Sequence, residues 1–166
     1  MCIRYRTGVV GKPLLKKLIE NGHEVYALSR SEESKKNLES QGVSVIGGDI
    51  LTSNLIDQFQ DINIDAIFHV AGVNKMCSKN PQYMFDANIE GTKNILSLGN
   101  DLEISKFVYT SSAVTLGEDL GSIGNEISTH RGYYLSKYEE SKFLAEQEAF
   151  NFEKKFDFVS VNPSSV

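Results

Sequence analysis

The strongest constraint on the fold is a regular alternation of short apolar runs with longer segments of helical period. The runs are nearly continuous in apolar residues, as expected for parallel strands covered on both faces. Strands are predicted at "HEVYALS" (23–29), "VSVIGG" (43–48), "DAIFHVAG" (65–72), "KFVYTSS" (106–112) and "FDFVSV" (156–161). Helices are predicted over 11–21, 32–40, 54–60, 81–98 and roughly 134–155. This order predicts an α/β fold, a Rossmann-like doubly wound parallel sheet with helices on both faces.

Composition narrows the class of protein. With 166 residues, 40% hydrophobic and 23% charged, the chain reads as one globular domain. A net charge of −5 without a Lys/Arg cluster argues against a nucleic-acid partner. No apolar run approaches the ~20 residues that span a bilayer, so we expect no membrane partner and a cytoplasmic location. Cys2 and Cys77 lack metal-ligand spacing, and we expect no metal.

The stretch "YRTGVVG" near the start has the end of a dinucleotide-binding turn. Gly8 and Gly11 stand directly before the first predicted helix, where glycines let phosphates approach the backbone amides. The helix N-terminus adds free N–H groups and a partial positive charge for a pyrophosphate. Tyr5 occupies the place of the usual first glycine, and Arg4 and Arg6 make this opening atypical for a buried first strand.

The residues after strand 23–29 bear on the choice of cofactor. A site that prefers NAD usually has an acid there to bind both ribose hydroxyls, whereas this chain has Ser29 and Arg30. Because a guanidinium suits a 2′-phosphate, the sequence favours NADP, with NAD as the alternative.

Two overlapping Tyr-x-x-Ser-Lys units, Tyr133/Lys137 and Tyr138/Lys142, lie in "YYLSKYEESKFLAE". Residues four apart share one helical face, where a lysine would lower a phenol pKa from about 10 and so equip it for proton transfer. Units five residues apart point about 140° away from each other, so one pair faces the pocket. We favour Tyr138/Lys142, because its face continues through small residues that allow close packing on a sheet.

Hydroxyl side chains follow the predicted strand 106–112. Thr110, Ser111 and Ser112 stand at its carboxyl end, where ligands of open α/β sheets bind. A serine hydroxyl there could donate a hydrogen bond to a carbonyl or alkoxide oxygen as charge develops.

Together these segments resemble the extended short-chain dehydrogenase/reductases, the NAD-dependent epimerase/dehydratase family with its dihydroflavonol-reductase-like group. The matching elements, in the family's order, are "TGVVG", "GGDILT", "IFHVAG", "NIEGTKNIL", "VYTSSAV", "YEESKFLAE" and "VNPSSV". The family continues after its tyrosine as "SKFLAE" does here, which supports Tyr138. Members of the family are longer, so the resemblance implies that 1–166 is the NAD(P)-binding Rossmann domain, truncated at both ends and without the C-terminal substrate-binding portion.

The resemblance also implies roles for individual residues. Ser112 would orient the substrate oxygen, Tyr138 would act as acid/base, Lys142 would bind the nicotinamide ribose and tune the tyrosine, and Asn88 would support the site. Cofactor contacts would come from Gly8 and Gly11 at the pyrophosphate, Arg30 at the adenosine phosphate, Asp49 and Ile50 at the adenine, Ala71 and Gly72 along the dinucleotide, and Pro163 and Ser164 at the nicotinamide.

The implied chemistry is hydride transfer between the nicotinamide of NADP or NAD and a carbinol or carbonyl carbon. The substrate would be a small carbonyl or alcohol compound or a nucleotide sugar, and reduction, epimerisation and dehydration all remain open. Leu116 and Gly117 stand where sugar-nucleotide epimerases often have Tyr-Gly, which favours a carbonyl reductase. Helices 81–98 and 134–155 would form a homodimer face. The alternatives are a non-catalytic nucleotide-binding or interaction module, or an inactive fragment.

Overall fold

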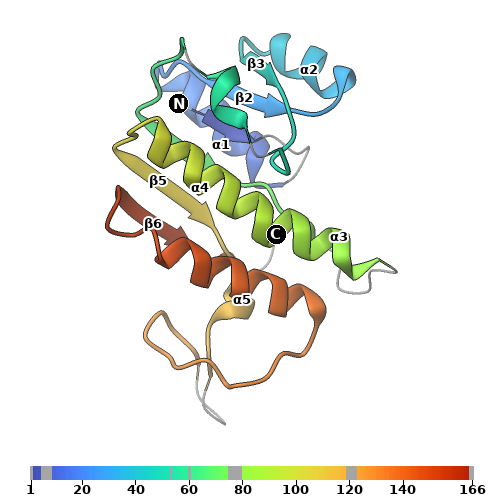
Figure 1. The fold of residues 1–166 in the computed structure, drawn as a ribbon, viewed down its shortest axis with the longest axis vertical. Helices are drawn as coiled ribbons and strands as arrows, with labels where there is room; N and C mark the ends of the chain where they lie inside the picture. Colours follow the sequence, from blue (N-terminus) through green and yellow to red (C-terminus); the bar gives the residue numbers. More distant parts are fainter. Residues whose placement is uncertain are drawn as a thin grey trace.

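The computed structural model describes the backbone of residues 2–4 and residues 9–52, 54–59, 61–74, 80–118 and 123–164 in full; Tyr5, Arg6, Gly8 and Cys77 lie outside them. Six parallel strands form one sheet in the order β3-β2-β1-β4-β5-β6 (Figure 1). They are β1 (Cys2–Arg4), β2 (Tyr26–Ser29), β3 (Ser44–Gly47), β4 (Ala66–His69), β5 (Lys106–Thr110) and β6 (Asp157–Val161). This is the strand order of doubly wound dinucleotide-binding sheets, so the predicted fold class is confirmed.

The atypical opening segment supplies the central strand. The backbone of β1 pairs in parallel with β2 on one side and with β4 on the other, with Ile3 opposite Ala27 and Phe68. The chain therefore runs outward from β1 to β3 and returns across the sheet to β4. Such a reversal of strand order leaves a crevice at the carboxyl ends of the two central strands, where ligands bind.

The helices are α1 (Gly11–Glu20), α2 (Glu32–Glu39), α3 (Pro81–Phe85), α4 (Gly91–Asp101) and α5 (Lys137–Phe150). The predicted helix 81–98 is one helical run, in which a π-helical turn, Asp86–Glu90, joins α3 to α4. The predicted helix 54–60 is shorter than expected, a single 3₁₀ turn over Leu55–Gln58. The last helix was predicted too long at both ends: it begins at Lys137 and ends at Phe150.

Helices cover both faces of the sheet. Both faces need cover because successive residues of these strands point to opposite faces and both sets are apolar. In β2, Ala27 packs beside Leu15 of α1, whereas its neighbour Leu28 belongs to the cluster on the other face with Leu96 of α4 and Ala145 of α5. The helices α4 and α5 lie side by side on that second face (Figure 1). Both hydrophobic clusters are buried. They pack the helices against the two faces of the sheet and so fix the positions of the strands whose carboxyl ends border the site.

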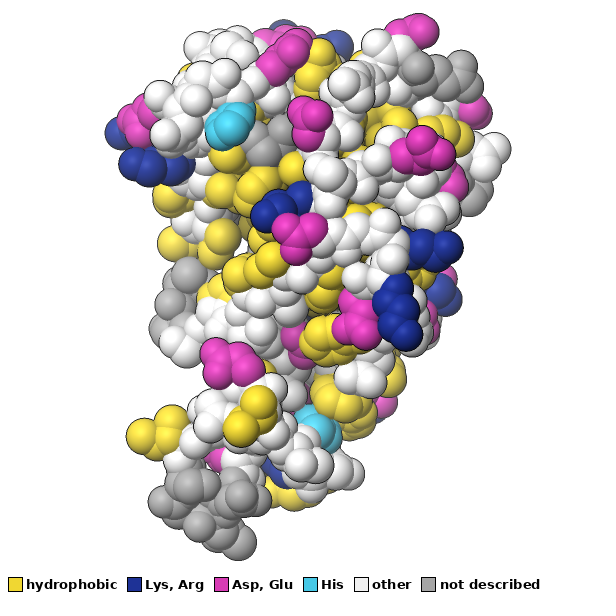
Figure 2. Space-filling model, turned by 90° about the vertical axis from the view of Figure 1, so that its left-hand side faces the viewer, with side chains coloured by type: hydrophobic (Ala, Val, Ile, Leu, Met, Phe, Trp, Pro, Cys, Tyr) yellow, Lys and Arg dark blue, Asp and Glu magenta, His cyan; other side chains and the backbone are white. Residues whose placement is uncertain are grey.

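The surface is mixed in character. On the face drawn in Figure 2, acidic and basic side chains are interspersed with hydrophobic ones. Within the described part of the chain, no helix has the length and apolar character needed to cross a membrane.

Candidate active site

A cleft of about 120 Å³ opens at the carboxyl ends of β4 and β5. Its walls come from the start of α1, the segments that follow β4, β5 and β6, and the first turns of α5. Six of the predicted site residues line it: Ala71, Gly72, Ser112, Tyr138, Lys142 and Pro163. Val10, Val70, Val73, Asn74, Thr110 and Ser111 complete the lining. Residues as far apart in the sequence as Val10 and Pro163 thus meet at the edge of the sheet where ligands of this fold bind.

Ser112 lies two residues beyond the end of β5 and is the N-cap of a short 3₁₀ turn, Ala113–Thr115. Its hydroxyl accepts a hydrogen bond from the Val114 amide at 3.4 Å, and its carbonyl accepts one from the Thr115 hydroxyl at 2.8 Å. Asn162, which follows β6, donates to the same carbonyl at 3.2 Å. The serine backbone is therefore tied to two neighbouring segments, while its hydroxyl keeps its own proton for a ligand in the cleft.

The start of α5 puts the two tyrosines in different surroundings. Ser136 is the N-cap, and its hydroxyl accepts from the Glu139 amide at 3.1 Å. Tyr133 therefore lies in the preceding loop with 60% of its surface exposed, so the prediction that it shares a helical face with Lys137 is wrong. Tyr138 lies in the first turn of the helix, lines the cleft and packs against the cluster of Val73, Met84 and Ala87.

Lys142, one turn further along α5, is buried with only 5% of its surface exposed. Its ammonium donates to the Tyr109 hydroxyl at 3.1 Å and to the Thr110 carbonyl at 2.9 Å, both on β5. Burial lowers the pKa of Lys142 to about 8, and the carboxylate of Glu146 opposes this shift. The group thus titrates much nearer to neutral pH than an exposed lysine does.

Asn88 lies behind the cleft rather than in its lining. It is 1% exposed and stands in the π-helical turn. Its side chain forms two hydrogen bonds with the backbone of Val73: the Val73 amide donates to Oδ1 at 2.7 Å, and Nδ2 donates to the Val73 carbonyl at 3.2 Å. The same Nδ2 donates to the Ser141 hydroxyl on α5 at 2.9 Å. Asn88 therefore connects the segment after β4 to the helix that carries Tyr138 and Lys142.

A smaller cleft of about 20 Å³ extends the site toward the predicted adenosine end. It shares Ala71, Gly72 and Val73 with the larger cleft and adds Arg30, Ile50, Tyr83 and Ala87. One guanidinium nitrogen of Arg30 donates to Asp49 at 3.1 Å and to the Tyr83 hydroxyl at 2.7 Å. These contacts join the carboxyl end of β2 to α3 across the cleft, whose volume is that of about one water molecule.

The remaining predicted residues that the structure describes lie around these clefts without lining them. Gly11 is the buried first residue of α1. It follows Val10, which lines the cleft and is the N-cap of the helix, without a side-chain capping hydrogen bond. Asp49 contacts Arg30 as described. Ser164 is exposed just after Pro163, whose carbonyl accepts from the Ala113 amide at 3.0 Å. Gly8 is outside the described residues.

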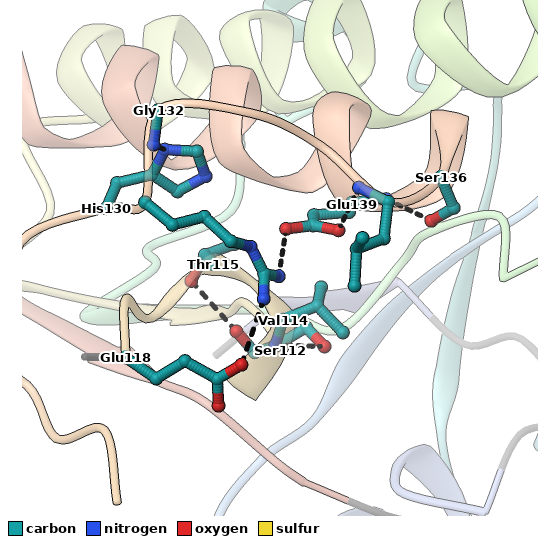
Figure 3. Close-up of polar contacts among 10 residues, drawn as sticks. Ser112, Val114, Thr115, Glu118, His130, Gly132, Ser136 and Glu139 are labelled. Carbon is teal, nitrogen blue, oxygen red and sulfur yellow. Dashed lines mark hydrogen bonds and ion pairs between the residues drawn. The ribbon is translucent and has the colours of Figure 1, made fainter. Parts of the chain in front are cut away.

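The loop before α5 is held by an arginine between two carboxylates. Arg131 forms ion pairs with Glu118 at 3.3 Å and with Glu139, and dashed lines in Figure 3 mark these contacts at the labelled carboxylates of Glu118 and Glu139. Glu139 is buried, and its other oxygen accepts from the Leu135 amide at 2.8 Å. This network fixes the first turn of α5, and with it Tyr138.

Two residues at the site were not foreseen from the sequence. Tyr83 holds Arg30, and Tyr109 holds Lys142. A signal for Tyr109 exists in the alternation of β5: it shares the buried face with Phe107 and brings a hydroxyl into an apolar environment. Tyr83 had no comparable signal, because its partner is 53 positions away.

The fold and the clefts define a dinucleotide-binding protein of the doubly wound class, and the comparisons identify its family. A model of the NAD dependent epimerase/dehydratase family matches residues 6–166. The chain belongs to this family.

A curated relative supports that assignment, and solved structures share the fold. A Synechocystis protein assigned as a dihydroflavonol 4-reductase is 32% identical over 96% of this chain and 47% of its own length. The crystal structure of gox2253 superimposes with a TM-score of 0.85 at 28% identity, over 98% of this chain and 50% of that one. The yeast methylglyoxal/isovaleraldehyde reductase Gre2, complexed with NADPH, gives 0.84 at 21% identity, over 98% and 57%. The chain thus spans about half the length of these relatives.

Proposed function

We propose that this chain is the NADP-preferring, cofactor-binding and catalytic portion of a carbonyl reductase. The observation that carries the proposal is the meeting of Ser112, Tyr138 and Lys142 in one cleft with Gly72 and Pro163. A pure binding module has no need of a serine hydroxyl, a phenol and a buried lysine converging at the carboxyl edge of its sheet.

The residues present fit a dinucleotide. The start of α1 has free amides and a partial positive charge suited to a pyrophosphate. A Cβ on Gly72 would lie 3.3 Å from the Asn88 side chain, so the segment after β4 keeps a bare backbone beside the cofactor path. When bound, the nicotinamide supplies or accepts the hydride.

Each member of the trio has a distinct part in the proposed reduction. Tyr138 gives its phenol proton to the substrate oxygen while the carbonyl carbon is reduced. Ser112 donates a hydrogen bond to the same oxygen as negative charge grows on it. Lys142, whose ammonium faces the same cleft, holds the ribose hydroxyls and favours the tyrosinate that remains. Oxidation of a carbinol is the same sequence in reverse.

The preference for NADP rests on Arg30. Its guanidinium lines the small cleft, 40% of its side chain is exposed, and the acid that it contacts, Asp49, comes from the segment after β3 rather than from the tip of β2. A 2′-phosphate can take the place of Asp49 as the anion beside Arg30. Since the cleft holds about 20 Å³, adenosine binding also requires the Arg30–Tyr83 contact to open.

The test is a titration of the 166-residue chain with NADPH and with NADH, followed by nucleotide fluorescence. We expect saturable micromolar binding of NADPH and weaker binding of NADH. Nucleotide binding with no turnover on a panel of small aldehydes and ketones would favour the non-catalytic module. A folded chain that binds neither nucleotide would contradict both readings.

We also propose a homodimer and a cytoplasmic location. The dimer is supported by the adjacent helices α4 and α5, which cover one face of the sheet, and by Tyr83 and Leu144, which are 38% and 37% exposed on these helical runs. Sedimentation equilibrium of the chain measures the first proposal: a monomer at tens of micromolar would contradict it. Fluorescence microscopy of a tagged chain measures the second.

A further inference from the structure

The ammonium group of Lys142 has two fixed acceptors on consecutive residues of β5. Its Nζ lies 3.1 Å from the Tyr109 hydroxyl and 2.9 Å from the Thr110 carbonyl, and 4.7 Å from the centre of the Tyr109 ring. An ammonium has three donors, so two are taken by the strand. Lys142 also lines the cleft, and its ammonium has no third hydrogen-bond acceptor among the contacts of the described residues, so we infer that the third donor serves a ligand there.

Tyr109 is held rigidly enough to act as a template. Its side chain is fully buried, and its ring stacks on His69 at 5.8 Å between centroids. His69 is itself fixed by the Thr92 hydroxyl at 3.0 Å, and Thr92 donates to the Asn88 carbonyl at 2.6 Å. Thr92 also forms a hydrogen bond with the Tyr109 hydroxyl. The phenol oxygen therefore has a position set by the core, not by solvent.

The hydroxyl remains neutral in this environment. Burial, followed by the negative charge of Glu146, raises the pKa of Tyr109 well above its ordinary value. The groups that face Lys142 are thus a neutral phenol from β5, a backbone carbonyl and the Glu146 carboxylate from its own helix, and Tyr138 lines the same cleft. A neutral acceptor stabilises the ammonium without neutralising its charge.

We propose that Tyr109 is a positioning residue: its hydroxyl and the Thr110 carbonyl fix the ammonium of Lys142 so that its remaining N–H points at the nicotinamide ribose. This inference rests on the proposed function in one respect, the identity of the ligand that Lys142 meets. The contact between Tyr109 and Lys142 does not depend on it.

The test compares Tyr109→Phe with the wild-type chain, since this change removes one oxygen and keeps the ring. Trace acetylation with acetic anhydride over a range of pH, read by peptide mass spectrometry, gives the midpoint of Lys142 titration, with exposed Lys137 as an internal control. Losing a hydrogen bond to the ammonium should lower the Lys142 midpoint by about one pH unit. Tyr133→Phe, which removes an exposed phenol, should leave it unchanged.

Nucleotide binding supplies the second readout. In Tyr109→Phe, we expect about tenfold weaker NADPH binding. The Lys142 ammonium would no longer be held in position, and its charge-assisted contact with the nicotinamide ribose would be lost. Adenosine 2′,5′-bisphosphate lacks the nicotinamide ribose and should bind with unchanged affinity. A general disturbance of the structure would weaken both ligands alike, and that result would overturn the positioning role.

The outcomes separate the two proposals. An unchanged Lys142 midpoint in a folded Tyr109→Phe chain would overturn this inference even if NADPH binds. If Tyr109→Phe shifts the Lys142 midpoint but the wild-type chain binds no NADPH, the contact between Tyr109 and Lys142 stands and the proposed function is overturned. If Tyr109→Phe does not melt cooperatively, Thr92→Val, which removes the neighbouring hydroxyl, should lower the midpoint by a smaller amount, and no change there would count against the inference.

Discussion

Arg30 and Asp49 form an ion pair of 3.1 Å that joins the carboxyl end of β2 to the segment after β3, at the mouth of the small cleft. The other oxygen of Asp49 accepts from the Leu51 amide at 3.1 Å, so the carboxylate is held by its own turn as well as by the arginine. The pair therefore places a guanidinium at the proposed adenosine end while keeping an acid within reach of it, and the two residues should have opposite effects on the choice of nucleotide.

Replacing either residue tests this balance. Arg30→Ala should weaken NADPH binding by about tenfold and NADH binding much less, because only NADPH carries the 2′-phosphate. Asp49→Asn keeps the acceptor for Leu51 but removes the competing charge, so NADPH binding should improve several-fold. Both measurements are fluorescence titrations at low salt. Equal effects on the two nucleotides would remove the proposed role of Arg30. Because the pair is partly exposed, Asp49→Asn should change the free energy of unfolding by less than about 1 kcal/mol.

The acid/base role of Tyr138 can be separated from that of its neighbour. Tyr138→Phe should lower turnover of a carbonyl substrate by at least about 100-fold, the usual contribution of a positioned proton donor, while NADPH affinity stays within about twofold. Tyr133→Phe is the matched control in the same segment and should retain full activity. Loss of turnover in the Tyr133 variant alone would show that the exposed tyrosine is the reactive one.

Gly91 is required by the close approach of α4 to Ile50. A Cβ at this position would lie 2.2 Å from Cδ1 and 2.8 Å from Cγ1 of Ile50, a side chain that is 1% exposed. Overpacking costs about 1–3 kcal/mol, and the better helix propensity of alanine returns up to about 1 kcal/mol. Gly91→Ala should therefore destabilise the chain by roughly 1–2 kcal/mol in urea unfolding. Gly47→Ala, where a Cβ would meet nothing within 4 Å, should have no measurable steric cost.

The buried lysine makes stability depend on pH. Its pKa is about 8 in the folded chain against 10.5 for the ordinary side chain, so between these values the unfolded chain binds more protons than the folded one. The free energy of unfolding should thus increase by roughly 2 kcal/mol as pH rises from 8 toward 10. Below pH 8 the lysine is charged in both states, and the full cost of burying its charge destabilises the folded chain. Lys142→Met should be more stable than the parent at pH 7, and the difference should narrow by pH 10. A constant difference across that range would contradict the lowered pKa.

The strands and the main site residues agree with the predictions from the sequence better than the helix bounds do. The apolar runs identified β2 to β6, and the family's motifs pointed to Ser112, Tyr138 and Lys142, which share one cleft. The start of α5 was misplaced although its signal was present, since Ser136 and Glu139 have the spacing of a capping box. The short helix after β3 was overestimated because its apolar residues pack as a single 3₁₀ turn.

The sequence by itself determined the fold class, because periodicity and glycine or proline punctuation act locally, within a few residues of the chain. It also determined which residue types are available for chemistry. The tertiary structure alone decided their partners: Arg30 with Tyr83, Asn88 with Ser141, and Lys142 with Tyr109. Each of these contacts joins elements that are at least 33 positions apart. Such pairs follow from the order of strands in the sheet and the packing of helices on it, and no local pattern encodes either.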